Sequence, residues 1–93
     1  MIPQDYTVID LEMTGLHPKN DAILEVGAAK IRNGEVTDTM DIFVNPGRKI
    51  TQEITELTGI TDEMVKEGLS PAAAFHKTAE FIGDDILAGH NII

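Results

Sequence analysis

Two acidic residues near the start of the chain, Asp10 and Glu12, have side chains and a spacing suited to holding a metal ion. They lie in the run YTVIDLEMTGL, residues 6–16, whose β-branched and apolar residues predict a strand. Residues two apart on a strand point to the same side, about 6.6 Å apart along the chain, so the two carboxylates converge. Adjacent carboxylates repel each other unless a proton or a cation lies between them, and their oxygens suit hard divalent cations.

The same alternation predicts which side chains this strand buries. Thr7, Ile9 and Leu11 point away from the acids and are expected to be buried, whereas Val8 shares the acidic side. A D-x-E pair on a strand also fits a solvent-exposed edge that binds nothing. The spacing alone leaves both interpretations open.

The full string DLEMTGL, residues 10–16, resembles the first motif of the DEDD exonuclease superfamily, D-x-E-T-T-G-L. Two later strings, ELTGITDEMV and AGHN, are similar to the DEDDh exonucleases that proofread for bacterial replicative polymerases, whereas the M-T-G-L variant is similar to the oligoribonuclease branch. The resemblance extends from about residue 6 to the last residue. It implies a 3′→5′ exonuclease that hydrolyses phosphodiester bonds at single-stranded DNA ends, with RNA as the alternative substrate and a DNA polymerase as a partner.

In enzymes of this family, four carboxylates hold two Mg²⁺ or Mn²⁺ ions and a histidine activates the attacking water. The resemblance makes Asp10 and Glu12 the first two of these catalytic, metal-binding carboxylates, with Asp10 bridging both ions. The string HNII, residues 90–93, matches the opening of the H-N-x-x-F-D motif that supplies the third acid, and the later H-x(4)-D motif is absent. We therefore expect residues 1–93 to be the N-terminal part of a single exonuclease domain, inactive by itself.

The resemblance also implies contacts to the 3′-terminal nucleotide. Backbone groups at Met13, Thr14, Gly15 and Leu16 are expected to face it, because the absence of a side chain at Gly15 permits close approach.

A second group of substrate contacts is implied in the string EITELTGI, residues 53–60. Glu53 and Thr58 match two family positions around the 3′-terminal nucleotide, although many relatives carry histidine where Thr58 stands. Glu53 equally fits a carboxylate that stabilises the start of a helix. Leu57 and Ile60 are expected to be core or pocket wall.

Other polar residues have structural interpretations. Glu25 lies in a hydrophobic run, so a hydrogen-bonded strand position is expected rather than metal binding. His17, His76 and His90 have no partner pattern that would make them catalytic, and each is expected to be structural.

The remaining chain predicts strands and then helices. Residues 22–32 are typical of a largely buried second strand, and Asn33-Gly34 favours a tight hairpin into an antiparallel third strand at residues 35–44. A short apolar run at residues 86–89 predicts a fourth strand, parallel to its neighbour because a helical crossover precedes it.

Three helix starts precede that last strand, each marked by a hydroxyl residue that can cap a helix: Thr51, Thr61 and Ser70. Glycines at 59, 68 and 83 are placed to end these helices. The third helix is expected to bury one apolar face, formed by Ala72, Phe75, Ala79 and Ile82. The fold class is thus α/β, and the resemblance implies a ribonuclease H-like mixed sheet with helices on its faces, truncated after the fourth strand.

Composition limits the function further. The net charge of −9 argues against broad attraction to nucleic acid, yet it is compatible with a nuclease that meets phosphate through bound cations. The chain has no cysteine, which excludes disulfides and thiolate metal sites and fits a reducing cytoplasm. No segment approaches the ~20 apolar residues of a membrane span, so no membrane partner is expected.

An alternative of a different class is a non-catalytic module that uses the same fold to bind a partner. The fourth strand, residues 86–89, would lie at an exposed edge of the sheet, where unpaired backbone groups invite pairing with another chain. Self-association through this edge is the corresponding expectation.

Overall fold

The computed structural model describes residues 4–15 and 21–89 and arranges them as a four-stranded sheet with three helices. The strands are β1 (Tyr6–Met13), β2 (Ile23–Arg32), β3 (Glu35–Phe43) and β4 (Leu87–Gly89). The helices are α1 (Gln52–Thr58), α2 (Asp62–Lys66) and α3 (Pro71–Ile82). No helix among the described residues is long and apolar enough to cross a membrane.

The sheet mixes antiparallel and parallel pairs, as expected. Its order is β3-β2-β1-β4, with β1 antiparallel to β2, β2 antiparallel to β3, and β1 parallel to β4. The hairpin between β2 and β3 turns at Asn33 and Gly34, whose φ angles of 53° and 77° are the positive values that a tight two-residue hairpin requires. The acid-bearing strand β1 therefore occupies an interior position in the sheet.

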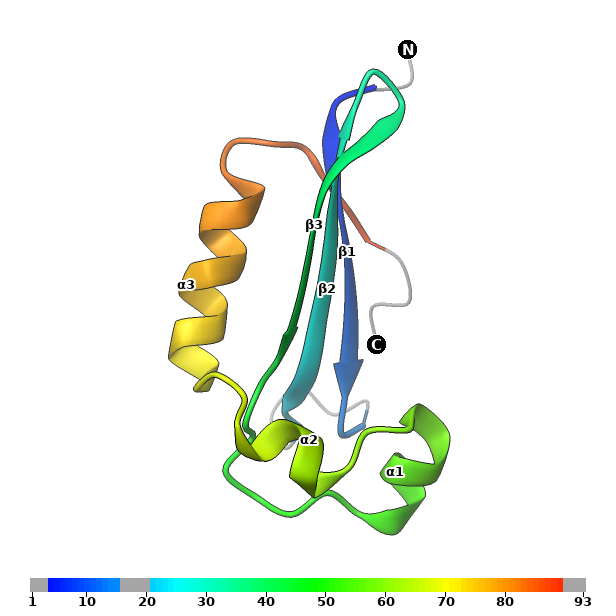
Figure 1. Ribbon diagram of the computed structural model, residues 1–93, viewed down its shortest axis with the longest axis vertical. Coiled ribbons are helices and arrows are strands. Elements are labelled where there is room, and N and C mark those ends of the chain that lie inside the picture. Colours follow the sequence, from blue (N-terminus) through cyan, green and yellow to red (C-terminus); the bar gives the residue numbers. More distant parts are fainter. Residues whose placement is uncertain (1–3, 16–20, 90–93) are drawn as a thin grey trace.

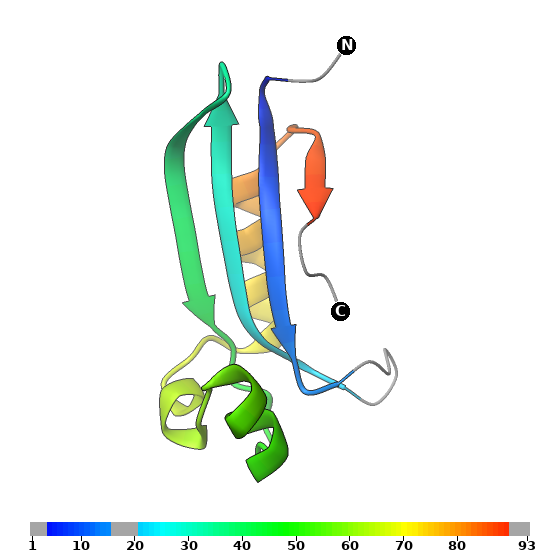
Figure 2. The ribbon, with the colours of Figure 1, turned by 90° about the vertical axis from the view of Figure 1, so that its right-hand side faces the viewer.

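The three helices of the described residues leave one face of the sheet open. Helix α3 packs against one face, whereas α1 and α2 lie at the end of the sheet where β1 and β3 end (Figure 1). The view onto the other face shows the four strands with no described helix in front of them (Figure 2). The alternation along β1 decides what each face carries: Thr7 and Ile9 are buried on the α3 side.

Two hydrophobic clusters hold these layers together. The first lies between the sheet and α3 and consists of Ile9, Val26, Ile42, Val44 and Ala74. The second attaches the short helices to the end of the sheet and consists of Leu24, Ile50, Ile60 and Val65. Burying these apolar side chains supplies the main favourable free energy of folding.

The buried face of α3 differs from the expected one. Ala74 is its buried residue, and Phe75, expected to be in the core, is 73% exposed. Ile82 does pack against the core cluster, as expected. The apolar spacing of 3, 4 and 3 residues predicted the helix correctly. The face that contacts the sheet is rotated by about one residue from the predicted face, because it carries Ala74 and the half-buried Thr78.

All three caps are confirmed. The hydroxyls of Thr51, Thr61 and Ser70 accept hydrogen bonds from backbone N–H groups three residues later. Gly59 ends α1 in the left-handed conformation, with φ 78°. These local signals are strong because each satisfies backbone groups that the helix end leaves unpaired.

A cluster of charged residues attaches the segment before β4 to the sheet. Asp85 accepts hydrogen bonds from Thr7 Oγ1 at 2.6 Å, Arg32 Nη2 at 2.9 Å and Lys30 Nζ at 3.2 Å. The bond from Thr7 and then the bond from Arg32 lower the pKa of Asp85 from 3.8 to about 2.

Replacing Asp85 by Asn is therefore expected to lower the melting temperature at neutral pH and to change it hardly at all near pH 2. Because the folded-state pKa lies below the unfolded value, the carboxylate contributes stability above about pH 4 and loses it as the pH falls through about 2. Thermal melts followed by circular dichroism at both pH values measure this. The neighbouring exposed acid provides the control, Asp84→Asn, and equal effects of the two substitutions would contradict the assignment.

Candidate functional site

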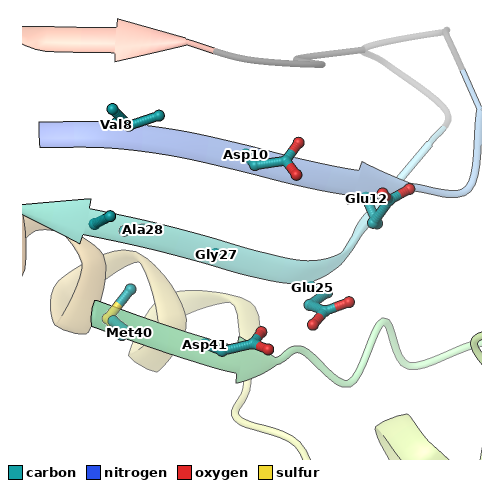
Figure 3. Close-up of a pocket in the computed structure, with 9 residues that line it drawn as sticks. Val8, Asp10, Glu12, Glu25, Gly27, Ala28, Met40 and Asp41 are labelled. Atoms are coloured by element: carbon teal, nitrogen blue, oxygen red, sulfur yellow. The ribbon is translucent and has the colours of Figure 1, made fainter. Parts of the chain in front are cut away.

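The open face of the sheet carries a pocket of about 350 Å³ at the β1–β2–β3 centre. Asp10, Glu12, Glu25 and Asp41 line it from three adjacent strands, with their carboxylates along the same part of the sheet (Figure 3). Strand pairing explains this arrangement, because residues opposite each other on neighbouring strands point to the same side. The described part of the chain thus collects four acids on a face that no described helix covers.

Gly27 lies at the centre of this arrangement. It pairs with Asp10 on one side and with Asp41 on the other, while Glu12 pairs directly with Glu25. Gly27 has no side chain, so the two aspartates face each other across an open strand position. The expectation that Asp10 and Glu12 share one side of β1 is met by this register.

Asp10 has an unusual environment for a carboxylate. Its Oδ1 atom is buried and has no hydrogen-bond partner among the described residues. Burying a carboxylate oxygen without a hydrogen-bond partner costs free energy, and a bound cation would offset that cost. The donor set fits a hard divalent ion, because all the nearby ligand atoms are carboxylate oxygens.

The described residues do not by themselves complete a metal centre. Within residues 4–15 and 21–89, no group of three or more His, Cys, Asp or Glu side chains is arranged to hold a metal ion. Asp10 and Glu12 would supply two of the ligands. The chemistry that such an ion provides is neutralisation of phosphate charge and activation of water near neutral pH.

Glu25 is the acid most affected by this crowding. A side-chain hydrogen bond with Asp41, burial, and the negative charges of Asp41, Glu12 and Asp10 together raise its pKa from 4.5 to about 7. The expectation of a hydrogen-bonded strand position for Glu25 agrees with this bond. At neutral pH, the Glu25 carboxyl is thus protonated in a substantial fraction of molecules, and its O–H donates a hydrogen bond to the Asp41 carboxylate.

Replacing Glu25 by Gln is expected to raise the melting temperature by roughly 2 to 5 °C at about pH 8 and to change it little at about pH 5. The folded-state pKa lies above the unfolded value, so stability falls as the pH rises from 4.5 to about 7 and the carboxyl ionises among other acids. Glutamine mimics the neutral carboxylic acid. Differential scanning calorimetry at both pH values measures the shift, with Glu80→Gln on the exposed side of α3 as the matched control.

The predicted substrate-contact residues at the end of β1 have defined positions, except for Leu16, which lies outside the described residues. The regular register with β2 shifts between Glu12 and Met13, so the strand pairing changes directly after the second acid. Thr14 and Gly15 continue from there and are only partly buried. No described contact tests their role toward a nucleotide.

The second predicted group lies on α1, at the end of the sheet where β1 ends and toward its open side (Figures 1 and 2). Glu53 is exposed in the first turn of α1, which agrees with the helix-start interpretation and leaves its carboxylate accessible. The Thr58 hydroxyl donates to the Ile54 carbonyl at 2.8 Å and accepts from the Ile60 N–H at 3.1 Å. Thr58 therefore has a structural role at the end of α1.

The two hydrophobic residues expected beside this group differ in burial. Ile60 is 2% exposed and belongs to the second core cluster, as expected. Leu57 is 80% exposed, so a core position for it is wrong. The helix turns Leu57 outward because Ile54 occupies the face of α1 that packs against the cluster.

Sequence reasoning missed Asp41, which lies in β3 and completes the row of acids. Its only sequence signal is its distance from the Asn33-Gly34 hairpin, and an unbroken ladder counted from that turn places Met40 opposite Gly27. The register shifts by one residue between Lys30 and Ile31, and this shift brings Asp41 onto the acidic face instead.

Comparison with known proteins gives matches over nearly the whole chain. A family model, RNase_T, described as an exonuclease, matches residues 7–93. The DNA polymerase III PolC-type proteins of Bacillus subtilis (strain 168) and Clostridium perfringens (strain 13 / Type A) are each 42% identical, over 88 and 87 residues, or 95% and 94% of this chain. The chain spans only 6% of the length of either relative.

Solved structures with the same arrangement are also exonucleases by their titles. Exonuclease I superposes with a TM-score of 0.80 at 18% identity, covering 96% of this chain and 21% of that one. The nuclease domain of 3′hExo, described as a DEDDh family member bound to rAMP, gives 0.75 at 20% identity, with 92% and 50% coverage. At this level of identity the likeness concerns the fold, a ribonuclease H-like mixed sheet with helices.

Proposed function

This chain belongs to the RNase_T exonuclease family, and we propose that it is the N-terminal part of a single metal-dependent 3′→5′ exonuclease domain acting on DNA ends. The observation that carries this proposal is the placement of Asp10 and Glu12 on the same open face of the sheet, with Asp10 Oδ1 buried and without a hydrogen-bond partner among the described residues. Divalent metal ions are general cofactors of such exonucleases, and Mg²⁺ or Mn²⁺ suits an all-carboxylate donor set.

In this proposal, Asp10 and Glu12 hold the cation and bring it against the scissile phosphate. Two further acids and a histidine, which match no described residue, would complete the metal site and activate the water. We therefore expect no detectable hydrolysis by the 93-residue polypeptide alone, because removing single groups of such a site already costs about 10² to 10³ in rate.

Met13, Thr14, Gly15 and Leu16 are proposed to face the 3′-terminal nucleotide, together with Glu53 on α1. Of these, Glu53 has an exposed carboxylate, and the segment beginning at Met13 directly follows the paired acids. Thr58 is the weakest member of the set, since its hydroxyl is already used within the end of α1.

The proposal includes a proofreading role beside a bacterial DNA polymerase, which is supported by the likeness to DNA polymerase III PolC-type proteins. The cytoplasm, where bacterial replication takes place, is the corresponding location. RNA remains the alternative substrate, favoured by the M-T-G-L variant of the first motif.

Hydrolysis of labelled oligonucleotides by the complete gene product tests the proposal. A 5′-labelled single-stranded DNA should shorten one nucleotide at a time in Mg²⁺ or Mn²⁺, stop on addition of EDTA, and resist degradation when its 3′ end carries a phosphate. A matched RNA oligonucleotide measures the sugar preference. Hydrolysis from the 5′ end, or unchanged hydrolysis in EDTA, would overturn the proposal.

A second candidate function, a non-catalytic module that self-associates, is favoured by the edge of the sheet. In the described part of the chain, β4 pairs only with β1, and the neighbouring Ile86 and Leu87 are 60% and 51% exposed. An open apolar strand edge favours pairing with another chain. Light scattering of the purified chain at increasing concentration tests this, and a strict monomer at high concentration would contradict it.

A further inference from the structure

The chain closes on itself directly after β1 through Thr14 and Asp21. The Thr14 hydroxyl donates to Asp21 Oδ1 at 2.7 Å and accepts from the backbone N–H of Ala22 at 2.9 Å. The Thr14 N–H donates to the Ala22 carbonyl at 2.9 Å. Three hydrogen bonds thus join Thr14 to residues 21 and 22, which lie directly before β2.

Gly15 packs against this arrangement, which we call the Thr14 clamp: the three hydrogen bonds that join Thr14 to Asp21 and Ala22. A Cβ atom on Gly15 would lie 2.7 Å from Asp21 Oδ2 and 3.0 Å from Asp21 Cγ, closer than non-bonded atoms approach. The Asp21 carboxylate therefore packs directly over the glycine. Any larger residue at position 15 would push this carboxylate aside and separate it from the Thr14 hydroxyl.

The clamp lies where the sheet stops fixing the chain. The regular pairing of β1 with β2 shifts between Glu12 and Met13, so ladder hydrogen bonds do not set the path of the following residues in a regular way. The hydrogen bonds of Thr14 take over that task two residues after Glu12. They fix the backbone at Thr14 against residues 21 and 22.

We propose that Thr14 and Asp21 are positioning residues, which hold the backbone at Gly15 in the orientation that receives the 3′-terminal nucleotide. This inference rests on the proposed exonuclease function. The Thr14 hydroxyl is committed to Asp21 and Ala22, so Thr14 acts through the backbone geometry and leaves the nucleotide contact to main-chain groups. A small displacement of the backbone at Gly15 would therefore weaken its contact with the nucleotide.

Binding of thymidine 5′-monophosphate, a product of 3′→5′ hydrolysis, tests the inference on the 93-residue chain itself. Amide signals of the ¹⁵N-labelled chain are followed by NMR while the nucleotide is added in the presence of Mg²⁺. In the wild type, signals of Asp10, Glu12 and Gly15 should shift together. Titration with Mg²⁺ alone measures the metal site separately.

Thr14→Val removes the hydroxyl at nearly constant shape and is expected to weaken nucleotide binding by roughly 5- to 20-fold, because it removes one charge-assisted hydrogen bond to Asp21 and one neutral hydrogen bond from Ala22. Its affinity for Mg²⁺ should stay within about twofold. Thr14→Ser, which keeps the hydroxyl, should restore binding, and Asp21→Ala should reproduce the loss. Thr39→Val, at an exposed position of β3, is the matched control.

The outcomes separate the two claims. Wild-type affinity for the nucleotide in both Thr14→Val and Asp21→Ala would overturn the clamp inference and leave the exonuclease proposal intact. The clamp inference would also be overturned if Thr14→Val weakened nucleotide binding and Thr14→Ser weakened it equally. If the wild type binds Mg²⁺ but no nucleotide, the positioning inference fails, while hydrolysis by the complete gene product still tests the proposed function. Dispersed amide spectra establish that each variant is folded.

Discussion

The Asp10→Asn variant should bind Mn²⁺ at least about tenfold more weakly than the wild type. One unit of negative charge a few ångströms from a divalent ion is worth more than 1.4 kcal/mol even at an effective dielectric constant of about 20. Asn keeps the size of the side chain, so the loss reports charge and ligation. Titration of Mn²⁺ followed by electron paramagnetic resonance, which detects the free ion, measures both affinities.

Asp38→Asn is the matched control for this prediction, since it makes the same change of charge at an exposed position of β3. It should leave the Mn²⁺ affinity within about twofold, because exposed charges more than a Debye length apart are largely screened. In the complete gene product, Asp10→Asn should lower the hydrolysis rate by roughly 10³-fold. Equal effects of Asp10→Asn and Asp38→Asn on Mn²⁺ binding would show that the ion is attracted only by the net charge.

Shortening Leu24 to Ala should destabilise the fold by about 3 kcal/mol, the typical cost of a large cavity in a core. Leu24 is 0% exposed and joins the cluster that attaches α1 and α2 to the sheet, while its carbonyl accepts the Val44 N–H at 2.8 Å. A domain of this size has little stability to lose, so a part of the variant should be unfolded at 37 °C. Urea unfolding followed by circular dichroism gives the free energy directly.

Leu57→Ala makes the same chemical change on an exposed helix surface. Because Leu57 is 80% exposed, its truncation should alter the free energy of unfolding by less than about 0.5 kcal/mol. A large loss from Leu57→Ala, or a small one from Leu24→Ala, would mean that the two clusters are wrongly assigned.

Local signals predicted most of the fold. The helix N-caps, the glycines that end α1 and α3, and the Asn33-Gly34 turn all depend on a few neighbouring residues, and each is found where expected. Helix α2 instead has Glu67 as its C-cap, one residue before the expected Gly68. The alternation along β1 likewise placed Asp10 and Glu12 on one face and Thr7 and Ile9 on the other. Such features are predictable because their causes lie within a few residues of chain.

The errors arise where long-range packing decides. Phe75 is one of the two phenylalanines of α3, yet the helix presents the smaller Ala74 to the sheet, since a small residue lets the helix approach the strands closely. Asp41 reaches the acidic face only because the β2–β3 register shifts near Lys30. No pattern within either segment carries that information, since a one-residue shift exchanges the two faces of a strand.

The position of a bound Mn²⁺ ion shows whether Asp10 and Glu12 hold a divalent cation. Manganese broadens NMR signals of nearby nuclei, so substoichiometric Mn²⁺ added to the ¹⁵N-labelled chain marks the amides closest to the ion. We expect broadening to be strongest at Asp10, Glu12 and Gly27 and to be absent there in Asp10→Asn. Broadening centred on exposed acids such as Glu35 and Glu63, with Asp10 and Gly27 unaffected, would contradict it.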